Sequence, residues 1–537
     1  MNKQITVFGK EGKDQLVRGV ELLAKAVKST LGPGGKNCVF NRGNGVNVTK
    51  DGVTVAKQIR SNNPIEQMGI DLVRQASEKT AGQAGDGTTT SSVLAEAIVK
   101  EGMTMLASGL NATSLQRGIL SAANTISEYI KNNLTKPCDS DAIRNIALVS
   151  TNWDEEIANL ISEVTIKLGL DGAVTVDSSG STKSFVKYID GMQIQRGYLS
   201  PYFITNQAKQ EVVLEKPLIC MLSEKLTNNI QLKPILECAY NYGKGQRSLL
   251  VIAPDIEQEA LRTLVVNKLN GVLNICAIKC PGFGDRMKDY MGDLEALCGG
   301  TYFTNLLNKT SKDIIGTDFG TAERVIITRD DTTIINGGGK EDAIKNRINF
   351  IKELLEKNKD SWQAREWKER IAKLSQGVGI INVGAATEAE LRERQDRVDD
   401  AICATRAAYE EGIVIGGGAT LAKLSNRKIN FEEGDHSFMT GIEIVKKALT
   451  KPLMQLLENA GIERPDIIID KVVKRPNNYG YDVKNRKFVD MLEAGIIDPA
   501  KVTCSALMNA ASVAGLILTT ECLISEDARK EDKGEDA

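Results

Sequence analysis

The two ends of this chain read as helical, whereas its middle reads as alternating strands and helices. Residues 10–30 and 437–460 carry apolar side chains at helical spacing, and the helical pattern dominates to about residue 134. In the middle, Ser248 to Pro254 is a strand-like apolar run, a helical stretch ends at Gly271, and a second strand-like run follows. A βαβ unit flanked by helical ends favours an α/β domain inserted into a helical domain that owns both termini.

Length and charge narrow the classes of partner. At roughly 150 residues per domain, 537 residues hold three or four domains. A net charge of -2 argues against nucleic acid, because a phosphate-binding surface needs a basic excess. No apolar run approaches the roughly 20 residues that span a bilayer, and the first fifteen residues lack the apolar core of a signal peptide. The sequence predicts a cytoplasmic protein without a membrane or nucleic-acid partner.

Cysteine and histidine offer little for catalysis. None of the ten cysteines forms a CxxC pair; Cys276 and Cys280 are the closest two, and the one histidine, His436, lies far away in the sequence. We therefore expect reduced, mostly buried thiols rather than a metal-thiolate site. Any chemistry would depend on carboxylates.

Four glycine-rich segments could surround a phosphate chain: TLGPGGKN (30–37), TKDGVTVAK (49–57), GDGTTT (85–90) and IGGGAT (415–420). Phosphates need backbone N–H groups without side chains in the way, and a carboxylate that holds a neutralising cation. GDGTTT supplies the glycines, Asp86 for Mg²⁺ and threonine hydroxyls at a helix start. An Asp/Thr helix cap explains the same segment equally well, and no segment matches the Walker A pattern.

Further segments follow in a fixed order: RGYLSPYF, PGFGDR, VGAATE, ATRAAYEEGIVIGGG, GIIDPAKVT and ASVAGLILTTE. Together with the four glycine-rich segments, they make residues 8–524 resemble the group I (GroEL-like, 60 kDa) chaperonins. The resemblance implies a multidomain α and α/β chaperonin fold with a helical equatorial domain, a small intermediate domain and an inserted α/β apical domain. The implied boundaries are equatorial 1–134 and 412–524, intermediate 135–190 and 378–411, apical 191–377, and a disordered charged tail 525–537.

The resemblance implies an ATP-dependent molecular chaperone, an ATP hydrolase, that promotes folding of non-native proteins within a ring-shaped cavity. The implied cofactors are ATP, Mg²⁺ and K⁺. The implied partners are unfolded or partly folded clients, copies of this chain in seven-membered rings stacked in pairs, and a GroES-like co-chaperonin lid. A ring-forming ATP-binding scaffold with an altered or co-chaperonin-independent cycle stays open, whereas a kinase-like enzyme has no acceptor site or Walker loop in its support.

Carried onto this sequence, the resemblance assigns the nucleotide site residue by residue. Asp86 is the expected Mg²⁺ ligand, and Asp400 and Asp51 are the expected catalytic carboxylates that position the attacking water. Asp400 is expected to reach the site only when the intermediate domain closes. The cofactor-binding residues are Thr30, Leu31, Gly32, Pro33, Lys50, Asp86, Gly87, Thr88, Thr89, Thr90, Gly417, Asp482, Val483, Ile496 and Asp498.

The expected client surface is apolar, because many unrelated unfolded chains must bind without fine polar selection. Apolar positions between residues 256 and 269 spread over about 240° of the helical wheel, which a helix buried on both sides explains as well. The substrate-binding residues implied by the resemblance are Tyr198, Tyr202, Phe203, Leu232, Leu236, Leu261, Val265 and Val266.

Three positions and the tail depart from the family pattern. Lys233 stands where relatives carry a leucine, Gln376 replaces the first glycine of a Gly-Gly hinge, and Asp482 replaces an amide near the base. The tail carries charges instead of Gly-Gly-Met repeats. The hinges are expected at two pairs of residues, Pro137 with Gly412 and Gly191 with Gly377.

Overall fold

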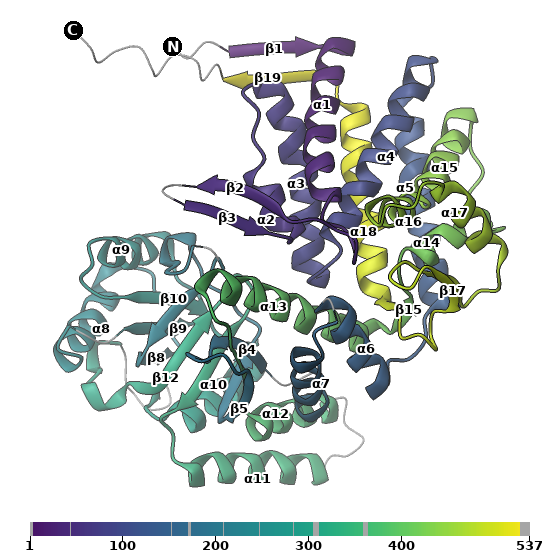
Figure 1. Cartoon of the computed structure of the whole chain (residues 1–537). Helices are drawn as coiled ribbons and strands as arrows, with labels where there is room; N and C mark the ends of the chain where they lie inside the picture. The colour runs from purple at the N-terminus through teal and green to yellow at the C-terminus, as the bar shows by residue number, and fades with distance from the viewer. Residues whose placement is uncertain are drawn as a thin grey trace. The chain divides into compact units, whose positions relative to one another are not determined.

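The computed structural model describes residues 4–42, 45–151, 153–169, 173–207, 209–245, 248–282, 284–303, 311–357 and 363–526. The chain divides into two compact units (Figure 1). The first unit contains Met1–Ile166, Ser178–Ser184 and Val383–Ala537, and the second contains Lys167–Asp177 and Phe185–Asn382. The chain thus leaves the first unit and returns to it, as the helical ends and the α/β middle predict. Most of the expected equatorial and intermediate segments lie together in the first unit, and the boundary between them stays a prediction.

The first unit is built mainly from helices. Its longer helices are α1 (Gly9–Lys28), α3 (Pro64–Ala84), α4 (Thr88–Ala107), α5 (Ala112–Tyr129), α7 (Glu155–Leu168), α13 (Glu388–Glu411), α15 (His436–Ala448) and α18 (Ala500–Thr519). The shorter ones are α2 (Gly52–Gln58), the π-helix η1 (Ile130–Leu134), α6 (Ser140–Ser150), α14 (Ala419–Leu424), α16 (Lys451–Asn459) and α17 (Pro465–Lys474).

Helix α18 is the centre of this unit and packs against α3, α4 and α5. In the described part of the chain it is the one helix long and apolar enough, by length and composition, to cross a membrane. The expectation that no apolar run reaches that length was therefore wrong. Because 72% of its most apolar window is buried inside the protein, its composition is explained by its place in the core.

The strands of the first unit form antiparallel pairs: β1 (Gln4–Phe8) with β19 (Cys522–Glu526), β2 (Cys38–Arg42) with β3 (Gly45–Thr49), β15 (Ile413–Ile415) with β18 (Ile497–Pro499), and β16 (Tyr479–Asp482) with β17 (Lys487–Asp490). Two corrections follow. The β2–β3 hairpin interrupts a stretch that was predicted helical, because a hairpin this short leaves only a weak periodic signal. The predicted disordered tail begins too early, since Ser525 and Glu526 pair with Ile5 and Gln4; its remainder, 527–537, lies outside the described residues.

The second unit is α/β. Its main sheet has the order β10-β9-β8-β12-β13-β6, with β11 beside β8 and β7 beside β12. The strands are β6 (Gly191–Ile194), β7 (Val212–Glu215), β8 (Leu218–Leu222), β9 (Leu249–Ala253), β10 (Ile275–Lys279), β11 (Tyr302–Phe303), β12 (Gly320–Ile327) and β13 (Thr332–Gly337). A smaller sheet joins β4 (Ala173–Ser178), β14 (Val378–Val383) and β5 (Phe185–Ile189).

The helices of this unit are α8 (Asn229–Tyr242), α9 (Gln258–Leu269), α10 (Asp285–Cys298), α11 (Glu341–Lys357) and α12 (Ala364–Gln376), with 3-10 turns η2 (Pro201–Phe203), η4 (Ser311–Asp313) and η5 (Gly316–Asp318). The predicted βαβ unit is confirmed, because β9 and β10 are parallel neighbours in the sheet and α9 connects them.

A buried ion cluster joins α10, α11 and α12. Asp293 is fully buried and accepts hydrogen bonds from Arg370 Nε at 2.7 Å and Nη2 at 2.9 Å, and from Arg347 Nε at 2.7 Å. Arg370 is itself only 1% exposed. The charges of Asp293 and Arg370 are therefore paired and hydrogen-bonded where water does not reach them, which is the condition for keeping ions in a core.

Candidate functional site

One pocket of about 360 Å³ in the first unit contains every residue that the sequence assigned to nucleotide binding and catalysis. Its lining comes from the loop after α1, the start of α2, the α3–α4 turn, α13, the loop after β15, and the β16–β17 and β18 region. A volume of this size lies in the ordinary range for small-molecule sites. The structure brings the residues together, while their individual roles stay predictions.

The two glycines of the GDG turn have different structural reasons. Gly85 ends α3 at φ 73°, and a Cβ on it would lie 1.9 Å from Cys403 Cβ on α13. Gly87 begins α4 at φ 87°, where a Cβ would lie 2.7 Å from a methyl of Val502. Positive φ favours glycine, and both close approaches exclude a side chain. The turn therefore lets α13 and α18 pass directly beside the start of α4.

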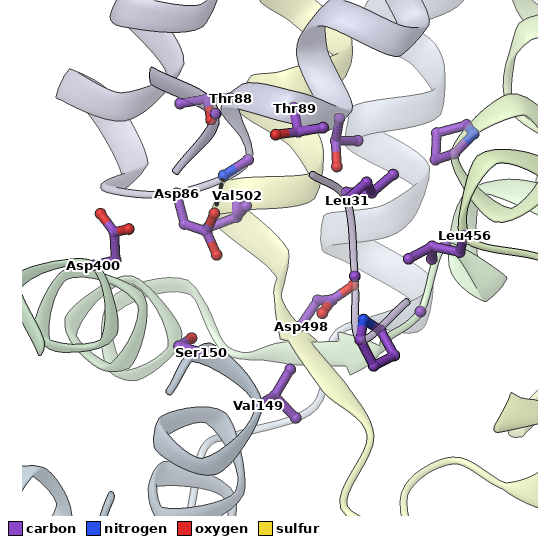
Figure 2. Close-up of a pocket in the computed structure, with 18 of the residues that line it drawn as sticks. Leu31, Asp86, Thr88, Thr89, Val149, Ser150, Asp400, Leu456, Asp498 and Val502 are labelled. Carbon is purple, nitrogen blue, oxygen red and sulfur yellow. Dashed lines mark hydrogen bonds between the residues drawn. The ribbon is translucent and has the colours of Figure 1, made fainter. Parts of the chain in front are cut away.

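The start of α4 is open toward the pocket. Its N-cap is Gly87, and no side chain caps the helix. The first N–H groups of an α-helix have no partner inside the helix and carry a partial positive charge. The pocket is lined at this point by Thr88, Thr89 and Thr90. Figure 2 labels the first two of them. The arrangement suits an anion, such as a phosphate group.

Asp51 lies beside this helix start and has a structural role of its own. Its carboxylate accepts hydrogen bonds from Val53 N at 3.0 Å and Thr54 N at 2.7 Å, and so caps α2. A Cβ on Gly52 would lie 2.4 Å from Thr89 Oγ1, which shows how closely α2 approaches α4. A carboxylate has about four lone-pair sites, so Asp51 retains capacity to accept a hydrogen bond from water.

The loop after α1 forms another wall. Asn459 on α16 donates from Nδ2 to Lys28 O at 2.8 Å and Leu31 O at 3.0 Å, which fixes the loop at its start. Gly32 adopts φ 75°, and a Cβ there would lie 2.1 Å from a methyl of Leu456. The loop TLGPGGKN is thus held against α16 with its backbone facing the pocket.

Apolar side chains from other elements also line the pocket: Ile146 and Val149 on α6, Val483 after β16 and Ile496 before β18. Asp482 is only 7% exposed, and its oxygens accept from Asn485 N at 3.0 Å and Asn485 Nδ2 at 2.7 Å. The aspartate that replaces the expected amide therefore stabilises the β16–β17 turn.

Three carboxylates lie together in the pocket. Figure 2 shows Asp86, Asp400 and Asp498 around one open space, on three different elements. Burial raises the pKa of Asp400 well above its ordinary value, and the charges of Asp51 and Asp86 raise it further. Burial and the charge of Asp51 also raise the pKa of Asp86, against the effect of its hydrogen bond from Gly87. Burial, and then Asp86, raise the pKa of Asp498 to about 7.

Burial and mutual repulsion both disfavour the ionised form of these three carboxylates. A cation bound beside them would lower their pKa values again. In the described ranges no group of three His, Cys, Asp or Glu side chains converges as a ready-made metal site. Mg²⁺ is usually held by one or two carboxylates together with phosphate oxygens and water. Asp86, beside the open start of α4, fits that pattern.

Asp400 already lines the pocket in this structure, whereas the sequence led us to expect it there only after a domain closure. It lies on α13, which packs against α6 and contacts α18. The neighbouring turns of α13 add Glu393, Asp396 and Arg397 to the pocket. We did not predict these three, although their spacing of three to seven residues from Asp400 places them on the same helix face.

The cations at the pocket are constrained. Arg397 donates to both carboxylate oxygens of Glu393 and, at 3.3 Å, to Thr151 O. Burial and the nearby charge of Arg397 lower the pKa of Lys50, an effect that Glu393 opposes. Lys50 lines the pocket, where its ammonium group can meet an anion.

Further lining residues come from α6, α16 and α18: Ile146, Val149, Ser150, Trp153, Pro452, Leu456, Val502, Thr503 and Ala506. Sequence reasoning missed these residues. Most are ordinary helix residues, and nothing in a single sequence separates them from core positions. Trp153 is different, because it is one of three tryptophans and directly follows a helix.

The second unit carries the expected client residues, with two corrections. Phe203 and Leu232 are fully buried, so they belong to the core and not to a client surface. Tyr202 and Val266 are 65% and 53% exposed, and Tyr198, Leu236, Leu261 and Val265 are partly buried. Ile230 and Leu269, which we did not assign, are 69% and 64% exposed.

The exposed apolar residues lie on adjacent helices. Asn229 at the start of α8 accepts from Thr263 Oγ1 on α9 at 2.6 Å, which places the two helices side by side. On the inner side of α9, Ala260 and Leu264 are fully buried. The reading of α9 as a helix buried all round was therefore wrong, because Val266 and Leu269 face outward. Lys233 on α8 is exposed and pairs with Glu237 at 3.7 Å.

Comparisons with known proteins agree on the fold. Residues 23–528 match the model of the TCP-1/cpn60 chaperonin family. The structure is similar to two crystal forms of chaperonin gp146 from the bacteriophage EL 2 (Pseudomonas aeruginosa), both crystallised in the presence of ATP-BeFx. For the first form the TM-score is 0.70 at 20% identity, and for the second 0.63 at 21%; each match covers 97% of this chain and 99% of the other.

Proposed function

Because the chain belongs to the TCP-1/cpn60 chaperonin family, we propose that it is an ATP-dependent molecular chaperone. It would bind non-native proteins on the apolar surface of the second unit and use Mg-ATP binding and hydrolysis in the first unit to drive their release and folding. The main support for a nucleotide site is that all four glycine-rich segments and Asp400 line one pocket.

The residues of the pocket divide the work of holding a nucleotide. The N–H groups at the start of α4 and the hydroxyls of Thr88–Thr90 donate to phosphate oxygens, and Lys50 adds a positive charge at the same end. Asp86 holds Mg²⁺, which when bound neutralises the phosphate charge. The apolar side chains of Ile496 and Val483 contact the base. The phage chaperonin was crystallised in the presence of ATP-BeFx, which supports this assignment.

Asp400 and Asp51 orient the water that attacks the γ-phosphate. Hydrolysis of the phosphoanhydride bond to the γ-phosphate needs an aligned water and a nearby acceptor more than it needs a covalent partner. The raised pKa of Asp400 suits a group that accepts a proton late in such a step. Asp51 is held in place by the two N–H groups it caps, so its free lone pairs have a fixed direction.

Client proteins would bind on α8, α9 and the turn η2 of the second unit. Uncovered apolar area is offered there by Tyr202, Ile230, Val266 and Leu269, and unfolded chains present apolar segments of varied sequence. We further infer a homo-oligomer of seven-membered rings, stacked in pairs, with K⁺ as a second cation and a GroES-like lid. A ring-forming ATP-binding scaffold with an altered cycle is the alternative, supported by the departures at Lys233 and Asp482.

Calorimetric titration with Mg-ATP tests the nucleotide site. We expect binding to the wild-type chain and none to Asp86→Lys, because a cation would replace the Mg²⁺ ligand. Glu78→Lys, an exposed position on α3 with the same change of charge, should bind as the wild type does. Retained affinity in Asp86→Lys would reject the phosphate-site assignment.

A further inference from the structure

Trp153 occupies an unusual backbone conformation at the edge of the pocket. It lies after α6 at φ 66°, which is costly for a bulky side chain. Its N–H donates to Leu148 O at 2.7 Å, and the indole is 40% exposed while lining the pocket. A large aromatic side chain held out of the core by a strained backbone calls for a reason.

The segment that carries Trp153 is tied to α13. Arg397 donates to Thr151 O at 3.3 Å, and Arg394 pairs with Asp154 at 3.5 Å. Thr151 is fully buried. Trp153 is therefore fixed, through the residues on either side of it, to the helix that bears Asp400.

Lys484 approaches Trp153 from the opposite side of the pocket. It lies in the β16–β17 turn, whose shape Asp482 and Asn485 fix by their two hydrogen bonds. Its Nζ is 4.7 Å from the centre of the Trp153 ring, within the range of a cation–π contact. No ion pair of Lys484 is present in the part of the chain that the structure describes, so the ring is the partner seen for this charge.

We propose that Trp153 and Lys484 form a clasp across the base end of the nucleotide pocket, which holds the Asp400-bearing helix against the β16–β17 hairpin and slows nucleotide release. The proposal rests on the nucleotide site proposed above. Both residues line the pocket and belong to different walls of it, so a nucleotide leaving past them must separate the two walls. Both act as positioning residues, since neither is placed at the phosphates.

Release of a fluorescent ADP analogue (mant-ADP with Mg²⁺), chased with unlabelled ADP in a stopped-flow instrument, measures the clasp in the full-length protein. An exposed cation–π contact predicts that Lys484→Met raises the dissociation rate about two- to five-fold, with a smaller change in the association rate. Lys484→Arg should restore the wild-type rate, because a guanidinium stacks equally well on an indole. Lys487→Met is the matched control, since it removes the same charge from an exposed position on the same hairpin outside the pocket.

A double-mutant cycle keeps the result tied to the contact itself. Trp153→Leu should also speed release, and adding Lys484→Met to it should bring little further change, because the contact is already lost. Fully additive effects, or equal rates for Lys484→Met and Lys487→Met, would overturn the clasp and leave the nucleotide site standing. Failure of the wild-type chain to bind mant-ADP would instead reject the proposed nucleotide site.

Discussion

The two units treat their uncompensated groups in opposite ways. In the second unit the buried carboxylate of Asp293 is fully paired with two arginines, while apolar side chains such as Val266 and Leu269 are left uncovered. In the first unit Asp86, Asp400 and Asp498 lie together in one pocket, and no ion pair of any of them is present among the described residues. Folding alone would pair such charges and bury such apolar groups. Under the function proposed above, these groups would meet their ligands: a cation with its anion in the first unit, and an apolar chain in the second.

The largest expected effect is at the paired carboxylate. Asp293→Ala removes the buried carboxylate that joins Arg347 and Arg370 and leaves them only the partly exposed Asp289, at 3.9 Å and 3.4 Å, which should lower the free energy of unfolding of the second unit by about 3 kcal/mol. Denaturant unfolding of the full-length chain measures this as an earlier transition. Mg-ATP binding at the first unit should persist in conditions where the variant stays folded. An unchanged free energy of unfolding would show that the ion cluster makes no net contribution to stability.

The unpaired carboxylate should behave in the reverse way. Asp400→Ala should slow ATP hydrolysis at least about tenfold while Mg-ATP binding is retained, because the water loses its acceptor. Asp400→Asn, which removes the charge and keeps the shape, should raise the free energy of unfolding by about 1 kcal/mol without nucleotide, since it removes repulsion from Asp51 and Asp86. Steady-state turnover and denaturant unfolding measure the two effects.

Asp399→Asn is the control for these variants, because its side chain leaves α13 about 100° away from Asp400. Turnover of Asp400→Ala equal to that of the wild type would remove Asp400 from the mechanism.

Asp498 predicts a pH dependence whose sign follows from its pKa of about 7. An aspartate in an unfolded chain has a pKa of about 3.9, so between these two values the folded protein binds the proton more tightly. The contribution of Asp498 to stability is therefore fully present near pH 4 and is lost as the pH rises to 7. We expect the wild type to lose about 1–2 kcal/mol more than Asp498→Asn between pH 5 and 7. Parallel pH profiles of the two proteins would contradict the buried, repelled state of this carboxylate.

The smallest expected effect is at the uncovered apolar surface. Val266→Ser replaces two methyl groups with one hydroxyl group at a half-exposed position, which should weaken capture of a chemically unfolded client about two- to five-fold. Basal ATP hydrolysis should stay unchanged, because Val266 and the pocket belong to different units. If Val266→Ser lost ATP hydrolysis but captured the client normally, α9 would be a core helix and not part of the client surface.

Much of this arrangement could be predicted from the sequence, because backbone requirements leave local marks. The GDG turn needs glycine at both ends, and the βαβ pattern around residues 249–279 is a matter of apolar runs and spacing. The family resemblance added Asp400, which no local pattern connects to a turn more than three hundred residues away.

Other features depend on long-range packing that a single sequence does not show. The burial of Phe203 and Leu232 is decided by what covers them, and an apolar residue looks alike in a core and on a client surface. The same limit applies to the charged stretch 341–376. Arg347 and Arg370 donate hydrogen bonds to Asp293 on α10, and nothing within the stretch itself shows that this partner exists. The wall formed by α6 has no motif of its own, so Trp153 became visible only through its contact with Lys484.

The pairing of β1 with β19 has a consequence for the order of synthesis. A ribosome delivers residues 4–8 long before residues 522–526, and α18, the core helix of the same unit, emerges only shortly before the later strand. The first unit therefore cannot complete its core until α18 and β19 have been made. The second unit comes almost entirely from one continuous stretch, Phe185–Asn382, so it can fold while the chain is still growing. During that interval the early helices of the first unit are themselves an unfinished chain with exposed apolar faces.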